Sequence, residues 1–299
     1  MKKLTYRKIK SAGAGVFIRC TLFLLYGIAF LILVIIAVKA APLLCSISLG
    51  QLLFSSVWHP QQGQFGFLPF IAGSLAVTFL AMVFALPVCL MSAVYITEYM
   101  NHRLRKWLRL SIDILAGIPS VIFGLFGVLT IVPAVRLLGE VTGRPSTGYS
   151  LLAAGVILAL MVSPFIISLS IEVLTNVPQE VRESALSLGA TRWEVIGHVL
   201  LKTAWPGIIA AVVLGLARAI GETMAVMMVA GNVAKIPGHL LDPVYPLPAL
   251  IANNYGEMMS IPKYDSALMF AALILMVIVA GFSFAAHVIL SRMHRRYSF

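Results

Sequence analysis

Six long apolar runs dominate this sequence and restrict it to a membrane-spanning fold. They lie at about residues 17–38, 67–96, 108–132, 150–171, 206–229 and 266–290. A transmembrane helix needs about 20 apolar residues, and only helices or closed barrels can pair every backbone group inside lipid. The composition agrees, because 60% of the residues are hydrophobic and 11% are charged, against about 25% charged in soluble domains. We therefore predict one all-α, polytopic membrane domain with six transmembrane helices.

The positive charges indicate how the chain is oriented. Short cytoplasmic loops of membrane proteins collect Lys and Arg. With the N-terminus in the cytoplasm, 16 of the 22 Lys and Arg residues fall on the cytoplasmic side, five fall outside and Arg218 lies within the bilayer. We therefore expect both termini in the cytoplasm, and we attribute the net charge of +11 to topology rather than to nucleic-acid binding. The basic start resembles a signal peptide, but its apolar run is long and five more runs follow, so we expect an uncleaved first helix.

Two ionisable residues stand inside the fifth apolar run. Arg218 and Glu222 are four residues apart, so a continuous helix would place them on one face, where they can neutralise one another. A charge at the centre of a bilayer costs at least about 2.5–3.5 kcal/mol. One interpretation is a stabilising ion pair inside the bundle. The other is an anion pathway, because the Arg guanidinium offers paired N–H donors to an oxyanion at any working pH.

A second unusual stretch surrounds Asp113, which is expected about one turn inside the third span. Gly117 and Pro119 follow it and interrupt regular helical hydrogen bonding, which a membrane tolerates only where protein or water satisfies the freed groups. Two interpretations stay open. The stretch is either a kink whose Asp113 pairs with Arg105 or Arg109, or it lines a pathway.

The segment at residues 180–199 is polar and helix-forming, although it stands between two apolar runs. Gly189 can end a short helix in the left-handed conformation without a steric penalty, so two helices would meet there at an angle. Apolar side chains recur along the segment, among them Leu188 and Trp193. An exposed apolar patch on a polar loop favours a partner-binding surface. The alternative is a surface helix that lies on the membrane.

Three stretches together resemble the C-type permease subunits of bacterial phosphate-specific transport systems. The first, Glu183-Ser184-Ala185-x3-Gly189, is similar to the EAA loop of importers driven by ATP-binding cassettes; the others run from residue 217 to 226 and from residue 113 to 121. The likeness covers most of the chain from about residue 67. The Arg-Ala-Ile-Gly-Glu-Thr-Met-Ala-Val run is the narrower motif, and the family associates its Arg and Glu with phosphate passage. Ser184 and Lys202 depart from the family loop, which has Ala and Pro there.

The resemblance implies a type I ABC importer permease and a division of the chain. Residues 1–66 would hold the N-terminal tail, the first helix and an external loop, residues 67–292 the permease core with a cytoplasmic coupling loop at 177–206, and residues 293–299 a cytoplasmic tail. The candidate substrate-pathway residues are Arg218, Glu222, Thr223, Asp113 and Ser120. The candidate ATPase-coupling residues are Glu183, Ser184, Ala185, Gly189 and Trp193.

The resemblance also implies a bacterial inner-membrane phosphate permease and its partners: a second, A-type permease, a cassette ATPase dimer and an extracytoplasmic phosphate-binding protein. This chain has no Gly-x4-Gly-Lys-Ser/Thr loop, so we expect no enzyme activity of its own and MgATP in the ATPase subunits. No catalytic or metal site is expected, because His59 lacks a second ligand at suitable spacing and the three cysteines show no pairing.

Three alternatives stay open. A permease for sulfate or molybdate would use Arg218 in the same way. An ion-coupled carrier would use Asp113 and Glu222 as ion sites, and such carriers commonly show paired internal repeats. A membrane scaffold or sensor would leave Arg218 unexplained.

Overall fold

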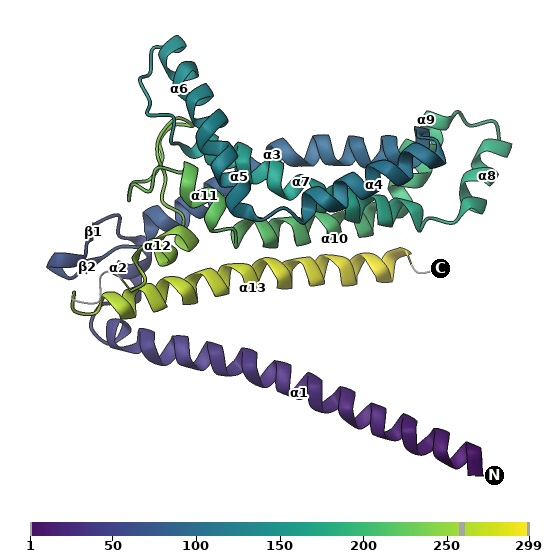
Figure 1. Cartoon of the computed structure of the whole chain (residues 1–299), viewed down its shortest axis with the longest axis horizontal. Coiled ribbons are helices and arrows are strands. Elements are labelled where there is room, and N and C mark those ends of the chain that lie inside the picture. The colour runs from purple at the N-terminus through teal and green to yellow at the C-terminus, as the bar shows by residue number, and fades with distance from the viewer. Residues whose placement is uncertain (1, 257–260, 298–299) are drawn as a thin grey trace.

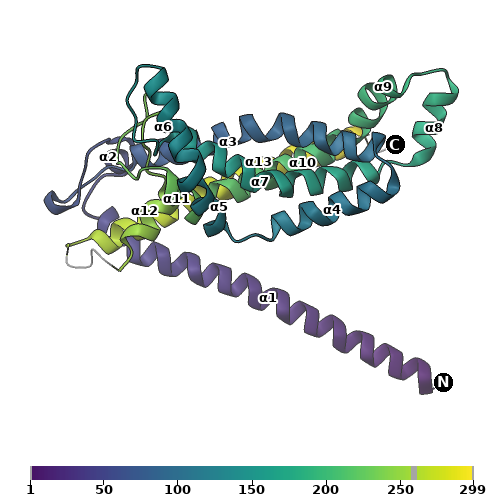
Figure 2. The same cartoon turned by 45° about the horizontal axis from the view of Figure 1, so that its top comes forward.

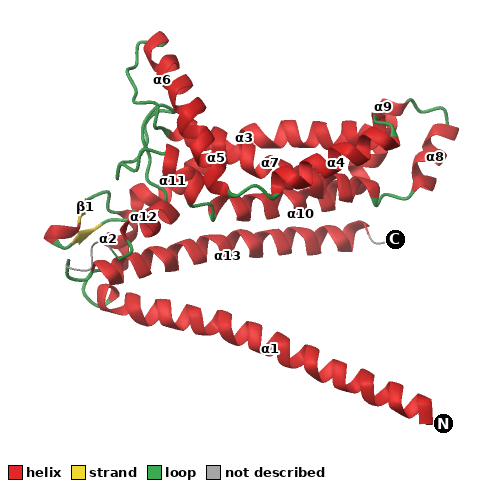
Figure 3. Ribbon diagram, viewed as in Figure 1, coloured by secondary structure: helices red, strands yellow, loops and turns green. Residues whose placement is uncertain are grey.

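The computed structural model of the chain describes residues 2–256 and 261–297 as an elongated bundle of helices (Figure 1). Figure 3 shows that helices account for nearly all of the regular structure, with one short hairpin. The α-helices are α1 Lys2–Leu44, α2 Leu49–Phe54, α3 Leu68–Val94, α4 His102–Ala116, α5 Ser120–Phe126, α6 Val132–Val141, α7 Leu151–Thr175, α8 Gln179–Ser187, α9 Arg192–Glu194, α10 Leu201–Ile220, α11 Met224–Val229, α12 Leu247–Asn254 and α13 Tyr264–Tyr297. The π-helical segments are η2 Tyr95–Tyr99, η3 Gly127–Ile131 and η4 Val195–Leu200; β1 Trp58–His59 pairs antiparallel with β2 Gln64–Phe65 across the 3-10 turn η1 Pro60–Gln62.

Six continuous helical runs in the described residues are long and apolar enough to cross a membrane, which confirms the prediction of a six-span, all-α fold. They are Arg19–Leu44, Leu68–Tyr99, Ser120–Val141, Leu151–Thr175, Arg192–Ile220 and Tyr264–Ala285. The N- and C-terminal ends of the chain lie at the same end of the bundle as α8 and α9, whereas α2, α6, α12 and the hairpin lie at the other end (Figures 1 and 2). Helix α13 continues through the expected C-terminal tail to Tyr297, and residues 298 and 299 of that tail lie outside the described residues.

The third predicted span is not a single helix. The run at residues 108–132 is divided between α4 and α5 at Gly117-Ile118-Pro119, because a proline lacks an N–H and its ring disfavours the helical conformation of the residue before it. Asp113 therefore lies in the last turn of α4, not inside an unbroken span. Pro87 and Pro164, by contrast, stay inside the uninterrupted helices α3 and α7.

The fifth predicted span also ends early. Helix α10 stops at Ile220, and α11 begins only at Met224. Glu222 and Thr223 thus lie in the connection between two helices. The four-residue spacing of Arg218 and Glu222 does not put them on one helical face, since the helix ends between them.

Small side chains bring the central helices α3, α7 and α10 together. Ala81 and Ala85 of α3 and Ala153 and Ala154 of α7 are buried in one cluster, and close approach through small residues is how membrane helices commonly pack. Helix α1 leans away from the bundle toward its N-terminal end (Figure 1). It packs beside α13, and none of its most apolar stretch is buried in the chain, as expected for a lipid-facing helix.

Candidate functional site

Arg218 lies in the last turn of α10, and its side chain reaches the middle of α7. Its guanidinium carbon lies 5.1 Å from the ring centre of Phe165, a residue near the middle of the membrane-spanning helix α7. An aromatic face attracts a cation at this distance, and stacking leaves the N–H groups at the edge of the guanidinium available to a ligand. Arg218 is exposed on the isolated chain.

The interpretation of Arg218 and Glu222 as an ion pair is wrong. The described residues contain salt bridges at Lys39, Arg136 and Arg182, and none of these involves Arg218. The reason is the end of α10, which sends Glu222 into a different role: its Oε1 accepts the backbone N–H of Ala225 at 3.4 Å and so caps the start of α11.

Thr223 and Ser120 lie beside this connection. The Thr223 hydroxyl donates to the carbonyl of Gly221 at 3.3 Å. Helix α5 and the start of η3, which continues it, pack along α11. A Cβ on Gly124 of α5 would lie 3.2 Å from the Cα of Ala225, and one on Gly127 of η3 would lie 2.7 Å from a side-chain carbon of Val229.

The two helices therefore run in roughly the same direction. Ser120 stands one turn before Gly124 in α5, so this packing puts it at the level of Glu222 and Thr223, which precede α11. The structure thus brings three of the five predicted pathway residues to one level of the bundle.

A polar stripe continues along α7 from Phe165 toward the end that carries α8. Ser168, Glu172 and Thr175 follow at intervals of three or four residues and so share one face of the helix. All three are at least partly exposed. The stripe makes a route of polar groups past an otherwise apolar helix.

Helix α4 lies against this stripe and adds Asp113 and Arg109 to it. The Ser168 hydroxyl donates to Asp113 Oδ1 at 3.4 Å, and Arg109 Nη2 donates to Thr175 Oγ1 at 3.1 Å. An open cavity of about 270 Å³ is lined by Arg109, Asp113, Ser168, Glu172, Thr175 and Asn176. The interpretation of Asp113 as the ion-pair partner of Arg105 or Arg109 is wrong, since neither pair occurs among the described residues.

Ser168, Glu172 and Thr175 are the members of this stripe that sequence reasoning missed. The fourth apolar run ends at about residue 171, whereas α7 continues to Thr175, so the polar residues of its last turn lie beyond the predicted span. The available signal was the regular spacing of Ser168, Glu172 and Thr175 next to an apolar run.

The loop between α7 and α10 carries the predicted coupling residues. Gly189 has a φ of +87°, which confirms that a left-handed residue ends α8 and redirects the chain toward α9. The apolar patch expected on this segment is only partly at the surface: Leu188 is 89% exposed and Trp193 is 72% exposed, whereas Val195 and Ile196 are buried in the chain. Such a patch is typical of a surface that another protein covers.

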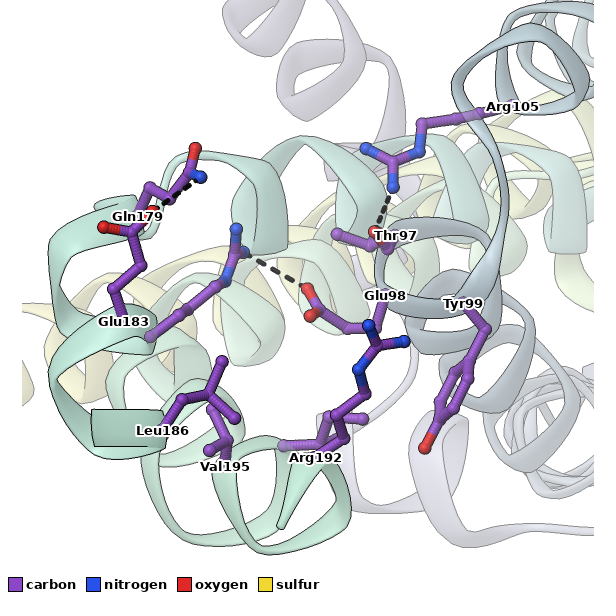
Figure 4. A pocket seen from close by; sticks show the side chains of 11 residues that line it. Thr97, Glu98, Tyr99, Arg105, Gln179, Glu183, Leu186, Arg192 and Val195 are labelled. Atoms are coloured by element: carbon purple, nitrogen blue, oxygen red, sulfur yellow. Dashed lines mark hydrogen bonds and ion pairs between the residues drawn. The ribbon is translucent and has the colours of Figure 1, made fainter. Parts of the chain in front are cut away.

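The EAA-like residues themselves lie on α8. Glu183 accepts a hydrogen bond from Gln179 Nε2 at 2.9 Å. Ser184 is exposed and Ala185 is half-buried. A cavity of about 400 Å³ lies between α8, η2 and the start of η4, and Glu98, Arg105 and Arg182 line it together with Glu183 (Figure 4).

Comparisons with known proteins give a consistent picture. Residues 85–297 match the family model described as "Binding-protein-dependent transport system inner membrane component". The chain is 34% identical to the phosphate transport system permease protein PstC of Xylella fastidiosa (strain Temecula1), over 97% of this chain and 94% of that protein. It is 35% identical to the PstC protein of Pasteurella multocida (strain Pm70), over 81% of each chain. An inward-facing structure of the MetNI methionine ABC transporter covers 74% of this chain and 92% of its own, with a TM-score of 0.57 at 22% identity, which shows a shared fold.

Proposed function

Because this chain belongs to the family of binding-protein-dependent transport system inner membrane components, we propose that it is the C-type permease of an ATP-driven importer of inorganic phosphate. It is a multi-pass protein of the cytoplasmic membrane and a transport component rather than an enzyme. The observation that carries the proposal is Arg218, an exposed guanidinium stacked on Phe165 at the middle of α7. The relatives named as phosphate permeases support phosphate over other oxyanions.

The proposed pathway begins at Arg218. A phosphate that enters from the outer side would meet the free N–H edge of the guanidinium, and a planar fork matches two phosphate oxygens. The Phe165 ring, whose centre lies 5.1 Å from the guanidinium carbon, would hold the fork in place. Below it, Asp113 and Glu172 line the cavity at the other end of the stripe together with Arg109. Two carboxylates against one guanidinium leave a net negative charge, which would keep an anion from settling there. A transport pathway needs both a site that binds the anion strongly enough to be occupied and an exit that binds the anion weakly.

Permeases of this family act together with an ATPase and a substrate-binding protein, so we expect partners of these two kinds. We assign the face that exposes Arg218 to a second, A-type permease, which would close the pathway from the other side. The cassette ATPase dimer, which binds MgATP, would dock on the loop around Gly189 and Trp193. With that loop in the cytoplasm, both termini are cytoplasmic too.

Uptake by cells tests the proposed substrate. The chain and its partner subunits are expressed in a strain that lacks its own phosphate importers, and entry of radiolabelled phosphate is followed. We expect ATP-dependent uptake that a large excess of sulfate or molybdate does not reduce. Competition by either anion would favour a permease for another oxyanion, and uptake that an ionophore abolishes while ATP is plentiful would favour an ion-coupled carrier.

The cavity on α7 is tested by filling it. Ser168→Leu should stop most uptake, because the larger apolar side chain occupies the cavity between α4 and α7. Ser168→Ala, which only removes the hydroxyl, should keep at least half of it, since the hydrogen bond to Asp113 is long, at 3.4 Å. Uptake is measured at matched membrane content. Equal uptake by the two variants would place the pathway elsewhere.

Glu222→Gln separates the charge of Glu222 from its capping role. The Gln amide oxygen can still accept the N–H of Ala225, and Arg218 loses no ion-pair partner, so the folded yield should stay at the wild-type level. Uptake should fall, because Arg218 then holds the anion without a nearby negative charge to speed its release. Yield is measured by size-exclusion chromatography beside the uptake rate. Wild-type uptake would show that Glu222 acts as a cap alone.

A further inference from the structure

Helix α8 is attached to the rest of the described chain by few interactions. None of its residues is buried. Two of its side-chain hydrogen bonds stay within the helix, from Gln179 to Glu183 and from the Ser187 hydroxyl to the Glu183 carbonyl. Within the described residues, Arg182 supplies the hydrogen bond and the ion pair that join an α8 side chain to other elements.

Arg182 connects α8 to the ends of two membrane-spanning helices at once. Its Nη2 donates to the carbonyl of Leu174, in the last turn of α7, at 2.7 Å. The same nitrogen lies 3.3 Å from Glu98 Oε1 in η2, the π-helical end of the second span (Figure 4). A cation is favourable beside the unpaired carbonyls at a helix C-terminus, so both contacts reinforce one position of the guanidinium.

The segment that holds Glu98 is itself fixed. Arg105 of α4 donates from Nε to the carbonyl of Ile96 at 2.9 Å and from Nη2 to the carbonyl of Thr97. Glu98 therefore lies on a segment that α4 holds from the other side, and it acts as a firm anchor for Arg182.

The pair is shielded enough to resist separation. The side chains of Arg182 and Glu98 are 21% and 17% exposed. Arg182 Nε and Glu98 Oε1 are both inaccessible to solvent and have no hydrogen-bond partner among the described residues, so the attraction of opposite charges, not a hydrogen bond, holds the two side chains together. Separating a shielded pair leaves an uncompensated charge, which is strongly unfavourable. The connection at residues 176–178 is short, and Arg182 adds a second attachment of α8 to the end of α7.

We propose that the Glu98–Arg182 ion pair, with the Arg182 hydrogen bond to Leu174, is the joint that transmits movement of α8 to α3 and α7. The inference rests on the proposed docking of the ATPase at this loop. A displacement of α8 would carry the ends of both helices with it, and α7 is continuous from Leu174 to Phe165, so the movement would reach the ring against which Arg218 stacks. Glu98 and Arg182 are thus positioning residues for transport.

The first test measures phosphate uptake per ATP hydrolysed in complexes reconstituted with their partners. Glu98→Gln and Arg182→Gln should each lower this ratio about tenfold, within the range typical of coupling between sites, while the ATPase subunits still co-purify. The double variant Glu98→Arg/Arg182→Glu re-forms an ion pair and should recover part of the ratio. Recovery should be partial, because a Glu at position 182 cannot donate to Leu174. Arg103→Gln, on the exposed first turn of α4, removes a positive charge at the same end of the bundle and should leave the ratio unchanged.

A second readout does not depend on the substrate. In a chain whose native cysteines are replaced by Ser, the rate at which a thiol reagent labels Ser168→Cys reports opening of the α7 cavity. ATP should change this rate when Arg182 is present and should leave it unchanged in the Arg182→Gln background. If phosphate is not carried but the ATP effect depends on Arg182, the proposed substrate fails and the joint stands.

Two results would contradict the proposal that the Glu98–Arg182 pair transmits movement of α8. One is an ATP effect and an uptake ratio that stay at wild-type values in both single variants. The other is loss of folded complex in the single variants that the double variant does not restore, which would make the pair a structural contact alone.

Discussion

Arg218→Gln should lower phosphate uptake at least about 30-fold, the equivalent of the roughly 2 kcal/mol that a hydrogen bond to a charged group contributes. The amide fills similar space but offers one planar N–H₂ group and no charge to a multiply charged anion. Arg218 has no ion-pair partner among the described residues, and its contact with Phe165 is worth about 0.5–1 kcal/mol at an exposed site. Membrane insertion and assembly should therefore persist.

The measurement is initial uptake of radiolabelled phosphate at matched membrane content. Arg218→Lys should be impaired to a lesser degree, because it keeps the charge but loses the fork. Arg136→Gln is the matched control: Arg136 is an exposed arginine in α6, paired with Glu140 at 3.4 Å, and its loss should not change uptake. Near-normal uptake by Arg218→Gln would remove Arg218 from the pathway.

Gly189→Val should uncouple the permease from its ATPase. The φ of Gly189 is +87°, where a side chain with a Cβ costs about 1–2 kcal/mol and a β-branched one more. A Cβ at this position would meet nothing within 4 Å, so the whole effect comes from the backbone, which would move α9 and Trp193 away from their positions. We expect loss of ATPase co-purification in detergent and loss of uptake.

Gly189→Asn separates conformation from size. Asn takes the left-handed conformation far more readily than Val, so this variant should retain most of the co-purification and uptake. If Gly189→Val recovers the ATPase at the wild-type level and stimulates its hydrolysis normally, the loop is not the coupling element.

The six spans could be predicted because every helix that crosses lipid needs a long apolar run. The interruptions within these spans could not be predicted from the sequence. Pro119 stands at a break, just before the start of α5, whereas Pro87 and Pro164 lie inside helices. The difference depends on which neighbouring helices satisfy the freed backbone groups. Gly117, two residues before Pro119, adds a second weak point that the other two sites lack at that position.

The same reasoning explains what was correct and what was wrong about the site. Gly189 was predictable because its conformation is a local property of the loop. The pairing of Arg218 with Glu222 depended on an unbroken helix, and α10 ends at Ile220. The cavity beside α7 depends on Asp113 meeting Ser168, 55 residues further along the chain, and the joint depends on Glu98 meeting Arg182. Contacts of this kind are set by packing between helices, which one sequence does not specify.

The central claim is that this chain forms a phosphate pathway driven by ATP. The most direct measurement counts phosphate accumulated and ATP hydrolysed in liposomes that contain the purified complex of this chain, the A-type permease, the ATPase dimer and the phosphate-binding protein. We predict accumulation against a gradient that needs ATP, a fixed ratio of phosphate to ATP, and loss of accumulation in Arg218→Gln with the complex intact. Hydrolysis without accumulation in the wild-type complex, or accumulation of sulfate or molybdate in place of phosphate, would contradict the account.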